Sequence, residues 1–366
     1  MPTATERPGL RLTRRSAIAL LGAMAWPLAQ ARGGLDGTEL LATWFTGERQ
    51  YAGRLRLTAE AVQVRQQTEL PTRAHGLVRW ADGSVLVSAR RPGDWLLRWH
   101  PDTGASTWHW VHDDRRLNGH VLASSDAASV WTTETDQANA QGLIGVRDAR
   151  SLDKTAEWPT HGMDPHAALV LPAALGGWPA GTLLVANGGI PTQSETGRSH
   201  RDLTRMDPSL VALDPRSGAL LGQWRLPDAR LSVRHLAYDP VSRCVGVALQ
   251  AEHGDPAVRR DAPLLATWDG RALRLAPPLP GAGGYAGDIC VRAGGGFWLS
   301  ATRSDALLAL NAEGVLQQRV ALPAASALVS GHGPAWAGGA FAVWQDAGRA
   351  PSSALRLDNH WVLANA

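Results

Sequence analysis

The chain of 366 residues has only two cysteines, Cys244 and Cys290, and a single lysine, Lys154. So few cysteines exclude a disulfide-rich scaffold, and they exclude a zinc site built from cysteine alone. The patterns Cys-x-x-Cys, His-Glu-x-x-His, Gly-x-Ser-x-Gly and the Walker loop are also missing from the sequence. With no nucleophile paired to a base, a serine or cysteine hydrolase is not expected.

The chain also lacks a large excess of charge once its N-terminus is set aside. It has 36 basic and 33 acidic residues and a formal net charge of +3. The first 31 residues hold four arginines and one glutamate, so 32 residues of each sign remain after them. A chain without net charge has no long-range field that would collect phosphate backbones. Nucleic-acid binding is therefore not expected.

Residues 1–31 have the pattern of a twin-arginine signal peptide, which is set aside before the fold is considered. Arg14 and Arg15 precede the apolar run AIALLGAMAWPLA, and the sequence Ala-Gln-Ala at 29–31 offers a cleavage site. The run is too short for a permanent membrane anchor. We therefore expect a periplasmic protein with no membrane span in its mature chain. In that oxidising compartment the two cysteines could pair, or they could remain buried thiols.

Short strand patterns, in contrast, are abundant and repeat along the chain. One set of alternating apolar segments opens on Gly or Ser, a second set ends in a polar turn, and a third often ends on Leu-Pro. Seven units of about 45 residues, each with four short strands, are typical of a β-propeller. We expect an all-β fold, a single seven-bladed propeller of four-stranded antiparallel blades over residues 33–366.

The two ends of the repeat are less regular than its middle. The alignment takes GGAFAVWQD (338–346) as a second strand and SALRLDNH (353–360) as a third strand. The N-terminal segments ELLATWFTGE and YAGRLRLTAE supply a further second and third strand. Their unit then lacks an innermost strand, which either residues 33–39 or the C-terminal WVLANA would provide.

Five histidines and one aspartate recur at the same position of the repeat, at the start of the expected innermost strands. Because the innermost strands line the central channel of a propeller, we expect these side chains to gather around one axis. A ring of neutral imidazoles there would suit Fe, Cu or Zn. Polar residues that only cap strands and bind channel water are the alternative. The residues at this position are His75, His120, His166, His235, Asp288 and His332.

Two long connections, residues 190–208 and 251–262, are expected on the face where these strands start. Long connections without regular structure are often binding elements or lids. Arg198, in the first, and Arg234 are expected to contact an anion or to support the metal ligands. The full set of residues expected in such supporting roles is His161, Asn187, Arg198, Arg234 and Asp288.

Six motifs together are similar to the DUF1513 family over residues 40–360. They are AHG (74–76), THGMDPH (160–166), VANGGI (185–190), MDPSL (206–210), SVRHL (232–236) and DNH (358–360). The resemblance implies a twin-arginine-exported, propeller-like bacterial protein of unknown function. Family members tend to be encoded beside imelysin-like and di-haem peroxidase-like proteins, which implies an iron-related setting. The family usually has Gly where this chain has Asp164, so Asp164 is not counted as a site residue.

The leading interpretation is a non-enzymatic periplasmic monomer that binds a metal ion, or a metal-bearing partner, in iron acquisition or handling. The expected partner is a periplasmic protein of an iron-uptake cluster. The first expected ligands are His75, His166 and His235, followed by His120 and His332. One alternative is a metal-dependent oxidoreductase or lactonase-like enzyme that uses the same site. Another is a protein-interaction scaffold whose histidines are structural, since a fold alone does not assign a function.

Overall fold

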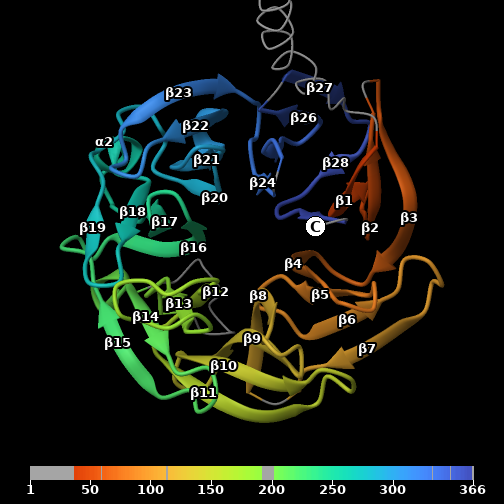
Figure 1. Cartoon of the computed structure of the whole chain (residues 1–366), viewed down its shortest axis with the longest axis horizontal. Coiled ribbons are helices and arrows are strands. Elements are labelled where there is room, and N and C mark those ends of the chain that lie inside the picture. The colour runs from red at the N-terminus through yellow and green to blue at the C-terminus, as the bar shows by residue number, and fades with distance from the viewer. Residues whose placement is uncertain are drawn as a thin grey trace, which may run out of the picture.

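The computed structural model describes residues 37–58, 60–112, 114–191, 202–331, 333–346 and 348–364. Seven antiparallel sheets surround one central axis, and the chain passes from each sheet to its neighbour in sequence order (Figure 1). The predicted seven-bladed propeller with four-stranded blades is therefore confirmed. The expected signal peptide, residues 1–31, lies outside the described residues.

Blade 1 contains strands from both ends of the chain, and blades 2 to 7 follow in sequence order. The strands of blade 1 are β1 (Thr38–Thr46), β2 (Arg49–Leu57), β3 (Val62–Leu70), β28 (Arg356–Leu357) and β29 (Val362–Leu363). Blade 2 consists of β4 (Ala74–Arg79), β5 (Val85–Ala89), β6 (Trp95–Trp99) and β7 (Ser106–Trp110). Blade 3 consists of β8 (Arg115–Ala123), β9 (Ser129–Asp136), β10 (Gln141–Asp148) and β11 (Lys154–Met163).

The remaining blades have the same order of strands, from the axis outward. Blade 4 consists of β12 (Pro165–Val170), β13 (Leu183–Asn187), β14 (Ser209–Leu213) and β15 (Leu220–Trp224). Blade 5 consists of β16 (Leu231–Asp239), β17 (Cys244–Ala251), β18 (Leu265–Trp268) and β19 (Leu273–Leu275). Blade 6 consists of β20 (Ala286–Val291), β21 (Phe297–Ala301), β22 (Ala306–Leu310) and β23 (Leu316–Ala321). Blade 7 consists of β24 (Ala327–Val329), β25 (Trp336–Gly338), β26 (Ala342–Gln345) and β27 (Gly348–Ser352).

Three short helices interrupt connections between second and third strands, all on one face of the disc. They are η1 (Leu203–Arg205), α2 (Pro256–Asp261) and η2 (Thr302–Ser304). The innermost strands begin on this same face, because successive antiparallel strands reverse direction. We call it the entrance face. In the described part of the chain, no helix is long and apolar enough to cross a membrane.

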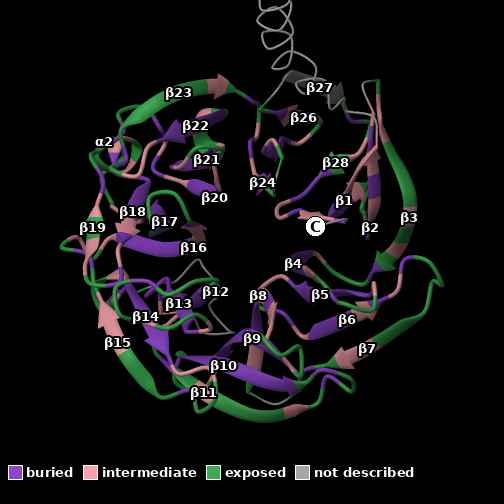
Figure 2. Ribbon diagram, viewed as in Figure 1, coloured by how far each residue is buried: buried purple, intermediate pink, exposed green. Residues whose placement is uncertain are grey.

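The apolar core consists of seven separate wedges, one between each pair of adjacent blades. Inner and middle strands are mostly buried on both faces, whereas outer strands such as β3 and β23 are largely exposed (Figure 2). Trp95, Trp268 and Trp298 are fully buried in wedges, as expected of tryptophans that pack sheet against sheet. Trp110 differs, because 45% of its surface is exposed on β7.

The C-terminus closes the ring, one of the two ways left open by the sequence. β28 and β29 pair with β1 on the axial side of blade 1, so the C-terminal segment supplies the missing inner strand. Of residues 33–39, the structure describes only 37–39, and Thr38 already begins the second strand of this blade. The assignment of 353–360 to a third strand was therefore wrong.

The alignment was also wrong in blade 7. Ala342–Gln345 is the third strand, β26, and the second strand is the three-residue β25 (Trp336–Gly338). Strands this short carry too few residues for a periodic pattern to be recognised. The alignment that put His332 at the channel position rested on this misassigned strand. His332 itself lies outside the described residues.

The two cysteines are free and buried, on β17 and β20. Burial raises the pKa of the Cys244 thiol to about 11 and raises that of Cys290 as well. Because the thiolate is the reactive form, both are expected to behave as inert apolar side chains. Of the two possibilities left by the sequence, the structure has buried thiols.

Candidate metal centre

Five histidines meet near the propeller axis, and each comes from a different blade. His75, His120, His166 and His235 lie on the innermost strands β4, β8, β12 and β16. The fifth is His360, which follows β28 in the segment that closes blade 1. We call these five residues the histidine cluster. Sequence alignment predicted four of them and missed His360.

A β-bulge lies at the channel position of five consecutive blades. The register of the innermost strand shifts between Ala74 and Leu77, Leu117 and Val121, Pro165 and Ala168, Val233 and Leu236, and Ala286 and Ile289. Each interval contains the residue that the alignment placed at the axis. Bulges re-aim side chains and are common beside functional sites. The repeated bulge therefore explains how residues from separate blades present their rings to one point.

The rings of the cluster are close enough to share one ion. Their centroids lie 4.5 to 6.3 Å apart in the contacting pairs. One nitrogen from each of His75, His120, His235 and His360 lies within 4.8 Å of the other three. Two nitrogens bound to one ion at about 2.1 Å lie about 3.0 to 4.2 Å apart, depending on their angle. Closing around an ion would therefore need shifts of about half an ångström.

His166 lies beside this group of four, next to His235. The Nε2 atoms of His166 and His235 are 2.8 Å apart, so one donates and the other accepts a hydrogen bond. Both side chains are buried, with exposed fractions of 5% and 4%. Two ligands of one ion would show nearly the same spacing. His166 is thus placed to become a fifth ligand, or to orient the ring of His235.

Burial disfavours the charged form of four members of the cluster. Loss of solvation lowers the pKa of His75, His120, His166 and His235 well below the usual histidine range. Charge on neighbouring histidines and on Arg90, Arg91 and Arg234 lowers these pKa values further. A neutral imidazole has a free lone pair, which is the form that binds metal.

Several ring nitrogens of the cluster have no hydrogen-bond partner among the described residues. They are Nε2 of His75, His120 and His360, and Nδ1 of His166 and His235. A buried polar atom without a partner costs about 1–3 kcal/mol. Coordination to a metal ion would give the Nε2 atoms the partner they lack. The donor set therefore fits a metal ion.

Asp288 holds the ring of His360. Its Oδ2 accepts a hydrogen bond from His360 Nδ1 at 3.2 Å, which leaves Nε2 as the lone-pair atom. The carboxylate is fixed by the backbone N–H groups of Ile289 and Leu328 at 2.9 and 3.0 Å. Such a carboxylate–histidine pair sets the tautomer and raises the basicity of a metal ligand. Asp288 thus has the position expected of a supporting residue.

An ion-paired triad flanks His166 and His235. Asp164 and Arg234 are both fully buried, and Arg234 donates from Nη1 to Asp164 Oδ2 at 2.9 Å. Arg91 pairs with the other oxygen of the same carboxylate. Because Asp164 lies two residues before His166 and Arg234 lies next to His235, the pair clamps two neighbouring inner strands. Asp164 was not counted as a site residue on sequence grounds, yet its buried ion pairs hold it beside the cluster.

Two of the other predicted supporting residues, Asn187 and His161, make their hydrogen bonds with groups outside the cluster. Asn187 is buried at the end of β13, where its amide donates to the carbonyl of Thr160 at 2.8 Å. That bond ties the end of blade 3 to blade 4. His161 is exposed at the end of β11, and its backbone carbonyl accepts from Gln223. Arg198 lies outside the described residues.

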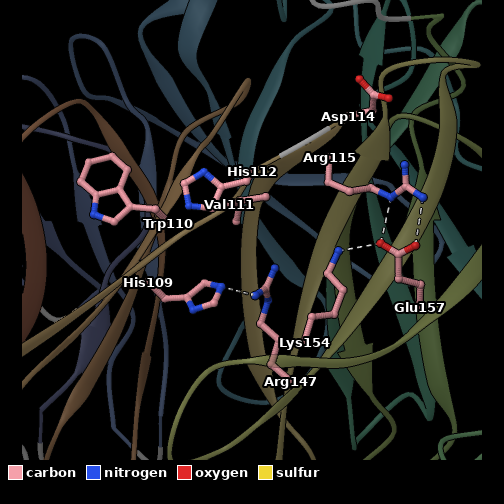
Figure 3. A pocket seen from close by; sticks show the side chains of 9 residues that line it. All are labelled: His109, Trp110, Val111, His112, Asp114, Arg115, Arg147, Lys154 and Glu157. Carbon is pink, nitrogen blue, oxygen red and sulfur yellow. Dashed lines mark hydrogen bonds and ion pairs between the residues drawn. The ribbon is translucent and has the colours of Figure 1, made fainter.

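A cleft of about 440 Å³ lies at the outer edge of the disc, between blades 2 and 3 (Figure 3). Several of its charged side chains are paired. Lys154 and Arg115 both donate to Glu157, at 2.6 and 2.8 Å, and hold the pKa of that carboxyl at about 2. Arg147 donates to His109 Nε2 at 3.0 Å. Groups that are satisfied in this way indicate a structural network, so the histidine cluster remains the candidate site.

The family model described as a protein of unknown function, DUF1513, matches residues 68–364. The chain belongs to the DUF1513 family. This match includes all five histidines of the cluster, and it confirms the resemblance found in the sequence motifs. No curated protein matches this chain.

Three solved structures with a similar fold are remote in sequence. Hydrazine synthase from Kuenenia stuttgartiensis has a TM-score of 0.58 at 14% identity, over 82% of this chain and 92% of that one. Virginiamycin B lyase from Staphylococcus aureus has a TM-score of 0.53 at 13% identity, over 75% of this chain and 80% of that one. A catalytically inactive variant of that lyase, with quinupristin, has a TM-score of 0.56 at 12% identity, over 79% and 87% of the two chains. At such low identity the likeness shows the propeller fold alone.

Proposed function

We propose that this DUF1513 protein binds one divalent transition-metal ion at the propeller axis. The observation that carries the proposal is the convergence of four histidines from four blades, with ligand atoms within 4.8 Å of one another. His75, His120, His235 and His360 are the proposed ligands. The unpartnered nitrogens of all four, and the lowered pKa values of His75, His120 and His235, support it.

The donor set narrows the choice of metal. Imidazole nitrogen suits Fe, Cu, Ni and Zn, whereas Mg and Ca prefer oxygen. Within the divalent series Cu binds nitrogen sites most tightly, so the ion bound in the cell depends on supply as well as on affinity. We propose Fe or Cu, with Zn as the third option. The proposed setting is the periplasm and the handling of iron, which the twin-arginine pattern and the family resemblance support.

The test is the metal content of protein exported and purified from the periplasm, measured by inductively coupled plasma mass spectrometry. Wild type is expected to carry near-stoichiometric metal, and a His75→Ala/His235→Ala double variant is expected to lose most of it. His161→Ala is the matched control, because that histidine is exposed on β11, and it should keep the metal.

Folding must be checked in parallel, because the cluster is buried. A His75→Asn/His235→Asn pair preserves polar side chains of smaller size, and its circular dichroism spectrum should match that of wild type. Equal metal content in wild type and in a folded double variant would contradict the proposal. Loss of metal from His161→Ala as well would show that the ion binds elsewhere.

A further inference from the structure

The spacing of the five rings sorts the histidine cluster into two kinds of position. The ring centroid of His120 is nearly equidistant from the other four centroids, at 4.9 to 5.3 Å. Those four form a quadrilateral with sides of 4.5 to 5.4 Å. Their order around it is His360, His75, His166 and His235.

The two diagonals of the quadrilateral are its longest distances. The centroids of His75 and His235 are 6.3 Å apart. His166 and His360 form the only pair without a ring contact within the cluster, whose members all belong to the described residues. The distances to His120 exceed half the measured diagonal, which sets this ring off the plane of the four. The cluster therefore has the outline of a square pyramid with His120 at its apex.

The spacing of His166 and His235 fits two neighbouring corners of the square. Ligand nitrogens bound at about 2.1 Å lie about 3.0 Å apart at a right angle and about 3.4 Å apart in a tetrahedron. The 2.8 Å between the two Nε2 atoms is closer to the first value. The ring that donates this hydrogen bond would carry its proton on Nδ1 once both Nε2 atoms bind an ion.

The backbone that carries His166 is fixed by side chains of blade 3. The carbonyl of His166 accepts a hydrogen bond from Thr133 Oγ1 at 3.1 Å, and the carbonyl of Pro165 accepts one from Asn118 Nδ2 at 3.0 Å. The ring itself has no such anchor, because its Nδ1 has no partner and its Nε2 contacts only His235. The strand is therefore held in place while the imidazole can reorient toward an ion.

His166 lies outside the group of four whose ligand atoms are within 4.8 Å of one another. Opposite ligands of one ion are about 4.2 Å apart, so His166 and His360 have to approach each other when an ion binds. His360 belongs to the closing segment, where β28 and β29 each pair with β1 at only two residue pairs. The approach therefore falls to a segment with few backbone constraints.

We propose that His166 is a fifth ligand and that the cluster holds its ion as a square pyramid. The inference rests on the metal site proposed above and adds its coordination number and its selectivity. A tetragonal set of nitrogen ligands suits Cu²⁺, whereas Zn²⁺ prefers four ligands in a tetrahedron. His166 is thus the residue that favours copper over zinc.

The experiment uses full-length protein loaded with Co²⁺, whose visible absorption is severalfold weaker with five ligands than in a tetrahedral site. Affinities for Cu²⁺ and Zn²⁺ are measured by competition with a chromophoric chelator. The variants are His166→Ala and His166→Gln, with His161→Ala as the matched control at an exposed position. Glutamine can keep a hydrogen bond to His235 but is a poor ligand for Cu²⁺. Circular dichroism is recorded first for every variant.

Wild type is expected to show the weak absorption of five-coordinate Co²⁺, and both His166 variants should show the stronger absorption of a four-coordinate site. Their affinity for Cu²⁺ should fall about tenfold or more, because a ligand counts for at least as much as the hydrogen-bond partner of a ligand. Their affinity for Zn²⁺ should change little, and His161→Ala should equal wild type.

A folded His166→Gln variant with wild-type affinity for Cu²⁺ would show that His166 only orients His235, and it would overturn the proposal. A tetrahedral Co²⁺ spectrum in wild type would do the same without any variant, and it would leave the site of four histidines intact. A wild type that takes up no metal would instead contradict the metal site itself.

Discussion

At Gly119 the backbone φ is +107°, and a Cβ atom added there would lie 2.6 Å from Cδ2 of the His75 ring. The glycine therefore provides the space in which the imidazole of the neighbouring blade packs. Gly76 is equally constrained, because its Cβ would lie 2.5 Å from the carbonyl oxygen of Gly119. The sequences His-Gly at 75–76 and Gly-His at 119–120 thus form one contact between two inner strands.

Replacing Gly119 by alanine should displace the His75 ring and reduce metal binding. The positive φ adds a backbone cost of about 1–3 kcal/mol for a residue with a Cβ atom. Gly104→Ala is the matched control, because Gly104 has a φ of +73° and no atom within 4 Å of the added Cβ. Both variants should lose stability in urea denaturation, but only Gly119→Ala should lose metal. Unchanged metal content in Gly119→Ala would show that the position of His75 is not critical.

At the scale of elements, the bulged inner strand is the unit that builds the site. The spacing from channel residue to second strand is regular in blades 2, 3, 5 and 6 and is lengthened by an insertion in blade 4. Sequence alignment could therefore find five residues, His75, His120, His166, His235 and Asp288. The bulges themselves leave no pattern in the sequence that alternation of apolar residues would reveal. In blades 2 to 6, sequence reasoning could therefore predict which residues reach the axis, but not how closely their side chains approach one another.

The alignment missed His360 because the strands of blade 1 follow a different order in the sequence. In blades 2 to 6 the channel residue precedes its second strand by about ten to twenty residues. In blade 1 the second strand, β1, begins the propeller, whereas the channel residue comes near the end of the chain. An alignment that looks upstream of each second strand cannot find such a residue. The motif DNH at 358–360 was the signal available, and a full count of channel positions would have drawn attention to it.

The contact between β20 and the closing segment gives an element-scale prediction. Asp288→Asn puts an amide where His360 Nδ1 and two backbone N–H groups now donate to a carboxylate. Metal affinity should fall by about 10–100-fold, as is usual when the partner of a ligating histidine is changed. Competition with a chromophoric chelator measures this, and Asp288→Glu should restore part of the affinity if the carboxylate acts by orienting His360. An unchanged metal affinity in Asp288→Asn would show that Asp288 does not contribute to metal binding.

At the scale of the whole molecule, seven apolar wedges hold the blades together, but the segment that closes the ring has few paired residues. β1 pairs with β2 at nine residue pairs, yet with β28 and β29 at only two pairs each. Side chains reinforce the closure, since Arg73 donates to Asp358 from Nε at 2.7 Å and to Asn359 from Nη2 at 3.1 Å. The metal site and the closure of the propeller therefore depend on the same few residues.

Metal binding should consequently stabilise the closing segment more than the rest of the propeller. A ligand at about 100 times its dissociation constant stabilises the state that binds it by about 2.7 kcal/mol, which corresponds to roughly 100-fold slower opening. Amide hydrogen exchange of residues 356–363 should therefore slow strongly when metal is added, whereas exchange in β14 and β22 should change little. His360→Ala should abolish the slowing because the closing segment would then contribute no ligand. If wild type binds metal but residues 356–363 exchange their amide hydrogens at the same rate with and without it, metal binding does not stabilise the closure of the ring.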